Sequence, residues 1–138
     1  MNHIQTEWER LLTVLMQAYS LSELLDIMKS ICINISPSTV NTRSKHFAHF
    51  KLTFFGLTVK ANGLIEKMEM NLDVLRKTVP ECENIYSELK KIKEEIDLAH
   101  NFIKMNKINE GKENIIRVAN EYSILFEQIM KLKENLWQ

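Results

Sequence analysis

The stretch that decides the fold is residues 115–136, IIRVANEYSILFEQIMKLKENL. Its apolar residues recur at alternating spacings of three and four, which is the heptad pattern of a helix that packs one face on a partner helix. This seam comprises Ile115, Val118, Tyr122, Leu125, Ile129, Leu132 and Leu136. The pattern predicts a helix over about residues 111–137.

A second seam precedes it, formed by Ile85, Leu89, Ile92, Ile96, Ala99 and Ile103. The apolar spacing fails at Asn106 and Glu110, and Gly111 lies in the turn-like stretch KMNKINEGKEN. We therefore predict an antiparallel helical hairpin over residues 80–138, with helices at about 80–106 and 111–137.

Residues 43–79 form a further helical segment in this interpretation. The apolar spacing runs through Ala61, Ile65, Met68 and Leu72 until Pro80, which cannot donate a backbone hydrogen bond and so predicts a break at 78–80. Residues 50–60 are ambiguous, because TFFGLTV is rich in the aromatic and β-branched residues that favour strands. We favour a helix, since the helical spacing continues through this stretch and no second strand is evident.

The N-terminal third has two parts. Residues 1–33 show helical apolar spacing and are expected to form one amphipathic helix or a pair that meets near Tyr19, because Ser20 and Glu23 resemble a capping box. Residues 34–42, which include NISPSTVN, are expected to form a loop. The predicted fold is all-α: an elongated, coiled-coil-like assembly of the C-terminal hairpin and additional N-terminal helices.

Composition argues against catalysis. The 138 residues include only 3 Gly and 2 Pro, which disfavours active sites built from loops. Neither a GxGxxG motif nor a glycine-rich loop ending in Gly-Lys-Ser/Thr is present, so the common nucleotide-binding signatures are missing. We expect a protein that is not an enzyme and carries no cofactor.

Metal binding and thiol chemistry are also not expected. Cys32 and Cys82 have apolar neighbours and are interpreted as buried structural thiols. Possible metal ligands at helical spacing are the pair His46 and His49, the single Asp97-x-x-His100 motif, and the carboxylates Glu66, Glu69 and Asp73. A di-metal site in a helical bundle needs two inward-facing Glu-x-x-His motifs, so solvated helix faces explain these residues better.

Charge is balanced overall but unevenly distributed. The 18 basic and 18 acidic residues cancel, so no global attraction to nucleic acid or to anionic membranes is expected. Residues 27–65, however, contain five basic residues and no acid. This basic segment motivates two alternative functions.

The first alternative is DNA binding. Residues 35–43, ISPSTVNTR, resemble the turn and the start of the recognition helix in helix-turn-helix regulators of the response-regulator type. The resemblance implies that Ser38, Thr39, Asn41, Thr42, Arg43 and Lys45 would face DNA. It covers about nine residues and departs from the family upstream, where Lys29 occupies a position that should be apolar.

The second alternative is a membrane surface, contacted by Phe47, Phe50, Phe54 and Phe55 beside Arg43, Lys45 and Lys51. Phenylalanines at helical spacing are more often core residues. The N-terminus MNHIQTEWER lacks the apolar stretch of a secretory signal, and no uncharged run approaches the roughly 20 residues of a membrane span. An intracellular protein, cytoplasmic or cytoskeletal, is therefore expected.

The favoured hypothesis is a structural subunit of a heteromeric coiled-coil complex, of the spindle, cytoskeletal or tethering type. Its seams have more apolar surface than one hairpin can bury, and further helices must cover it, from residues 1–75 or from another chain. We expect other coiled-coil subunits as partners, and neither nucleic acid nor membrane. The partner-binding residues would be Ile85, Leu89, Ile92, Ile96, Ile103, Ile115, Val118, Tyr122, Leu125, Ile129, Leu132 and Leu136.

Overall fold

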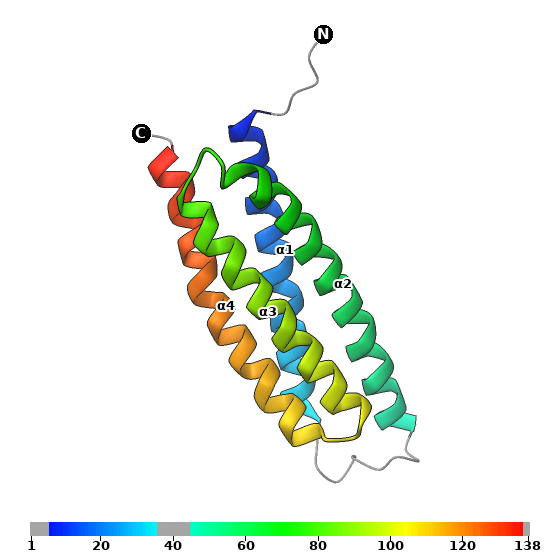
Figure 1. Ribbon diagram of the computed structural model, residues 1–138. Coiled ribbons are helices and arrows are strands. Elements are labelled where there is room, and N and C mark those ends of the chain that lie inside the picture. Colours follow the sequence, from blue (N-terminus) through cyan, green and yellow to red (C-terminus); the bar gives the residue numbers. More distant parts are fainter. Residues whose placement is uncertain (1–5, 36–44, 137–138) are drawn as a thin grey trace.

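A computed structural model describes residues 6–35 and 45–136, which form a bundle of four long helices (Figure 1). The helices are α1 (Glu7–Asn34), α2 (Lys45–Leu75), α3 (Glu81–Lys104) and α4 (Ile108–Leu136). They run alternately down and up, and the extensive contacts join α1 to α2, α2 to α3, α3 to α4 and α4 back to α1. The described residues contain no strand. The all-α prediction is confirmed.

The predicted C-terminal hairpin is present, but its turn is shorter than expected and lies earlier. Helix α3 ends at Lys104 and α4 begins at Ile108, instead of at about 106 and 111. Asn106 makes the reversal with a φ of 63°, a left-handed conformation that asparagine tolerates better than most residues. The backbone N–H of Lys107 donates to the carbonyl of Phe102 at 2.8 Å and closes the turn.

Gly111 therefore has a different role from the one predicted. It lies inside α4, where an added Cβ would be 2.5 Å from Cδ1 and 2.8 Å from Cγ1 of Ile103. The lack of a side chain lets α4 approach α3 closely just after the turn. Sequence alone could not separate a glycine that ends a helix from one that permits close packing.

The predicted break at 78–80 is confirmed, because α2 ends at Leu75 and Pro80 immediately precedes α3. Glu81 and Glu83 lie in the first turn of α3, where negative charge is favourable. The ambiguous residues 50–60 are helical and belong to α2. The helix is favoured over a strand because it turns four residues at helical spacing towards the core: Phe47, Phe50, Phe54 and Thr58.

Helix α1 is continuous from Glu7 to Asn34, so the alternative of two helices meeting near Tyr19 is wrong. Its start is fixed by Thr6, whose hydroxyl oxygen accepts a hydrogen bond from the backbone N–H of Glu9 at 3.1 Å. By length and composition alone, α1 is also apolar enough to cross a membrane. That property is shared by core helices of bundles, and α1 buries residues from Leu11 to Cys32 against its neighbours.

One continuous core runs through the bundle. It combines the two predicted seams of α3 and α4 with residues of α1 and α2 that include Leu21, Met28, Phe54 and Ile65. Tyr122 connects the two halves, because its hydroxyl donates a 2.7 Å hydrogen bond to the backbone carbonyl of Ala18. The surplus apolar surface of the C-terminal hairpin is therefore covered by the chain's own first two helices.

Candidate functional site

The seam predicted to bind a partner lies inside the bundle. Every member whose side chain is described, from Ile85 to Leu132, is at most 3% exposed. The side chain of Leu136 lies outside the described set. In this fold α1 and α2 of the same chain occupy the positions that another chain would have to fill, so a partner must use a different surface.

Residues 36–44, which contain most of the predicted DNA contacts, lie outside the described residues. Of the residues predicted to face DNA, only Lys45 is described. Lys45 is exposed at the start of α2. The two flanking helices, α1 and α2, pack antiparallel along their lengths (Figure 1). Helix-turn-helix motifs instead cross their two helices at about 90–120°, so this arrangement differs from the family that the segment resembles.

The phenylalanines of the membrane hypothesis belong mainly to the core. Phe47, Phe50 and Phe54 are buried in succession along α2, with ring centroids 6.3 Å and 6.0 Å apart. Phe55 is half-buried and packs on the imidazole of His100 at 4.6 Å. These rings are not free to enter a lipid surface while the bundle is folded.

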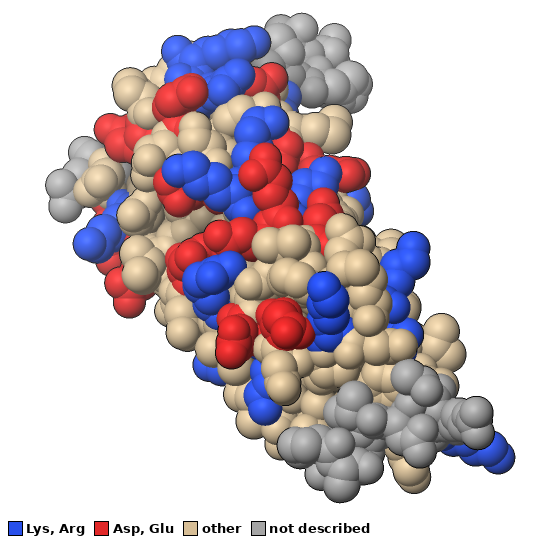
Figure 2. All heavy atoms as spheres, turned by 60° about the horizontal axis from the view of Figure 1, so that its bottom comes forward, with Lys and Arg blue, Asp and Glu red and all other residues tan. Residues whose placement is uncertain are grey.

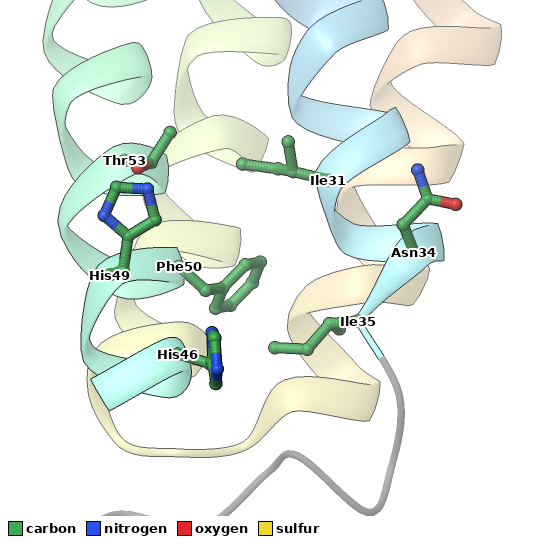
Figure 3. Close-up of a pocket in the computed structure, with 7 residues that line it drawn as sticks. All are labelled: Ile31, Asn34, Ile35, His46, His49, Phe50 and Thr53. Carbon is green, nitrogen blue, oxygen red and sulfur yellow. The ribbon is translucent and has the colours of Figure 1, made fainter. Parts of the chain in front are cut away.

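A hollow of about 470 Å³ opens between the end of α1 and the start of α2. Figure 3 shows His46, His49 and Phe50 on α2 facing Ile31 and Ile35 at the end of α1. The walls are mainly apolar. Among the described lining residues, the imidazoles of His46 and His49 are the only titratable groups.

The candidate metal ligands do not converge. Among the described residues, no group of three or more His, Cys, Asp or Glu side chains could hold a metal ion. The carboxylates Glu66 and Glu69 instead pair across the surface with Lys93 and Lys90 of α3, at 3.1 Å and 3.7 Å. Asp73 pairs with Arg76 at 2.7 Å. These carboxylates therefore form ion pairs with Arg76 and with basic side chains of α3, and the side chain of Glu69 is largely buried.

Both cysteines are fully buried free thiols, as predicted. Burial raises the pKa of Cys32 to about 12 and that of Cys82 to about 11. A nucleophilic cysteine needs the opposite shift, because the thiolate is the reactive form. The two thiols are packing groups.

A polar cluster lies where α3 meets α4. Arg117 donates to the buried amide oxygen of Asn114 at 2.8 Å and approaches the carboxylates of Glu95 and Glu121 at 3.8 Å and 3.9 Å. Burial raises the pKa of Glu95, and its hydrogen bond with Glu121 and the charge of that residue raise it further. Arg117 thus forms ion pairs with two neighbouring carboxyl groups, one on α3 and one on α4. These contacts help to fix how α3 and α4 pack together.

The feature that sequence analysis missed is the apolar outer surface of the N-terminal hairpin. Helix α1 exposes Leu12, Met16, Tyr19, Ile27 and Ile33, and α2 exposes Leu52, Val59, Met70 and Val74. On α3 and α4 only Leu98 and Ile124 are comparable among the described residues. The heptad pattern identifies only the inner face of each helix, although the sequence also contains this second set of apolar positions opposite the core.

The charged residues are distributed differently from the apolar ones. Figure 2 shows basic and acidic side chains interspersed on the face it displays, so that opposite charges lie beside one another. Such a surface is typical of a solvated helix face rather than of a nucleic-acid interface. The apolar outer surface of α1 and α2 is therefore the best candidate for a functional site in the described part of the chain.

Comparison with known proteins adds no relative: no family model, no curated protein and no solved structure matches this chain.

Proposed function

We propose that the protein is a non-enzymatic interaction module, a subunit of a larger assembly that binds a helix of another protein on the outer face of α1. The observation that carries the proposal is the stripe of Leu12, Met16, Tyr19 and Ile27, which lies opposite the core residues of the same helix. Exposed apolar stripes on a folded bundle favour a docking function, because each costs solubility without adding to the core.

Charge indicates the kind of helix that would fit. Glu9, Glu23 and Asp26 share the outer side of α1 with the apolar stripe and are exposed. The basic Arg10 turns away from that stripe and donates to Asn71 of α2 at 3.3 Å. An amphipathic helix with basic residues beside its apolar positions would be complementary to this face, and its charges would select the orientation.

This mode of binding differs from the one expected from the heptads, in which the inner seam itself would pair with another chain. The inner seam supports the fold, and the outer face supports the interaction. A role in a spindle, cytoskeletal or tethering assembly belongs to this proposal as its biological setting, since long helical subunits suit elongated complexes.

Affinity capture from the native source, with the full chain as bait, tests the proposal. Met16→Lys combined with Ile27→Lys should remove a defined set of captured proteins by placing charges in the apolar stripe. The matched control is Ile124→Lys, because Ile124 is 64% exposed on α4 and Met16 is 71% exposed on α1. Equal capture by all three baits, each shown to be folded by circular dichroism, would contradict the proposal.

A further inference from the structure

The outer face of α2 contains a pattern that the fold of one chain does not explain. Leu52, Val59 and Met70 are 72%, 70% and 73% exposed, and their spacings of seven and eleven residues place them on one side of the helix. That side is opposite the core residues Phe54 and Ile65. The outer side of α2 thus presents three well-exposed apolar residues, with the charged residues Glu66 and Lys67 between Val59 and Met70.

Two glycines lie on the same side. An added Cβ at Gly56 or Gly63 would meet nothing within 4 Å, and neither residue has a positive φ. Glycine within a helix costs about 0.5–1 kcal/mol relative to alanine, and no contact or backbone conformation within the chain requires it here. Gly111 shows the contrast, since packing against Ile103 accounts for it.

The stripe and the glycines form one repeated unit. Leu52 is followed four residues later by Gly56, and Val59 is followed four residues later by Gly63. Over residues 52–63 a large apolar residue and a glycine therefore alternate along the face with a seven-residue period, and Glu66 occupies the next position of that period. Such a segment can pack against an antiparallel copy of itself, because a large residue of one copy can lie over a glycine of the other.

We propose that the outer face of α2 binds the same face of a second copy of this chain, with the two α2 helices antiparallel. In the register that also brings the flanking charges together, Val59 of each copy lies over Gly63 of the other, on both sides of the two-fold axis, and Gly56 of each copy faces Glu66 of the other. Leu52 then meets Met70 of the second copy. This proposal rests on the proposed function only in treating the outside of the N-terminal hairpin as an interaction surface.

The flanking charges favour this orientation. Lys51 lies on the α3 side of the stripe, where its ammonium donates to Asn106 at 2.9 Å. Glu69 and Asp73 occupy the acidic end of α2, and Glu69 likewise faces α3, where it pairs with Lys90. Antiparallel packing brings the α3 sides of the two copies together and so places Lys51 beside these acids of the second copy. Parallel packing would instead place Lys51 beside the α1 side of the same part of the second α2 helix, where residues 45–65 include no acid. Lys60 lies on the α1 side and extends into solvent.

The size of the face determines how strong the pairing is. The stripe from Ala48 to Val74 is about 39 Å long at 1.5 Å per residue, and a helix is about 10–12 Å wide. Two such strips give on the order of 800 Å² of total interface, below the roughly 1,200–2,000 Å² of stable complexes. The dimer should therefore exchange with the monomer as concentration changes.

Sedimentation equilibrium from about 1 µM to about 1 mM, the range of weak affinities, tests the pairing. The mean mass should rise from one chain towards two. Val59→Lys should weaken dimerisation by at least about tenfold, while Ile124→Lys on α4 leaves it unchanged. The mass of a single chain at the highest concentration would overturn the proposal, as would equal effects of the two substitutions.

Orientation is tested by oxidising chains with one engineered cysteine each. A mixture of Val59→Cys and Gly63→Cys chains should form the mixed disulfide faster than either chain forms a disulfide with itself. Faster self-linking of either chain would overturn the antiparallel arrangement. If dimerisation fails while the Met16→Lys/Ile27→Lys variant still loses its captured partners, the proposed function stands and only this inference falls.

Discussion

The two hairpins of the bundle bury similar apolar faces in the core but differ in the residues that they expose to solvent. Helices α3 and α4 expose few large apolar residues, Leu98 and Ile124 among those described, and most of their outer surface is charged, with pairs such as Lys91 and Glu88. Helices α1 and α2 bury equally regular stripes but also expose apolar residues on the opposite side. The C-terminal hairpin thus presents mainly charged residues to solvent, and the N-terminal hairpin presents the apolar surface that we propose as a binding site for another protein.

The largest difference in stability is expected between a charge placed on the buried side of α3 and a charge placed on its outer side. Ile96→Asp would bury an unpaired carboxylate at a fully buried position of α3. We expect a loss of about 3–5 kcal/mol in the free energy of unfolding, enough to unfold a marginally stable domain. Leu98→Asp, two residues away and 44% exposed, should change it by less than about 0.5 kcal/mol.

Urea denaturation followed by circular dichroism measures both variants. Comparable losses for Ile96→Asp and Leu98→Asp would mean that the buried face of α3 is placed wrongly.

The glycines provide a test in which the two hairpins respond with opposite signs. Gly111→Ala in α4 would force Ile103 to move, so we expect destabilisation by about 1–3 kcal/mol. Gly56→Ala in α2 meets open space and should stabilise the monomer by about 0.5–1 kcal/mol through helix propensity. Thermal unfolding of the two variants, compared at a low protein concentration, gives both signs. Stabilisation by Gly111→Ala would show that α3 and α4 are not in close contact there.

The connection between the hairpins has a smaller expected effect. Tyr122→Phe removes the hydroxyl that donates to the carbonyl of Ala18 while keeping the ring that fills the core. The expected cost is about 0.5–1.5 kcal/mol, the typical net contribution of one hydrogen bond. Chemical denaturation measures it, with Tyr86→Phe as the control because Tyr86 is only half-buried. No difference between these variants would remove the proposed link between α1 and α4.

The smallest effect concerns the charged surface of the C-terminal hairpin. Glu95 has a raised pKa because of burial and its neighbour Glu121, so its ionised form is disfavoured in the folded state at neutral pH. Glu95→Gln should therefore stabilise the protein by a few tenths of a kcal/mol at pH 7, within the range of surface ion pairs. The folded state binds the extra proton first, so the wild type recovers this difference as the pH falls towards 4.5.

Unfolding free energies of wild type and Glu95→Gln at pH 7 and pH 5 measure the effect. A Glu95→Gln variant that is less stable than wild type at pH 7, with the difference shrinking on acidification, would mean that Arg117 dominates the environment of Glu95.

Much of the fold could be predicted from the sequence, because the heptads of α3 and α4 and the break at Pro80 each follow from a local rule. The position of the hairpin turn could not, since Gly111 is required by a contact with Ile103 that no local pattern encodes. The apolar outer surface of α1 and α2 could not be predicted from such local rules. Leu52 and Val59 differ from core residues only in which side of α2 they occupy, and that depends on how four helices pack together.

The inner seam is completed by the four helices of one chain, and the apolar outer face of α1 and α2 stays exposed. Chemical denaturation of the Val59→Lys variant over a hundredfold range of protein concentration tests it most directly, because the outer-face dimer is suppressed in that variant. A core completed by one chain predicts a cooperative transition whose midpoint does not depend on concentration. A midpoint that rises steadily with concentration would show that the helices of another chain complete the core, and would contradict the account.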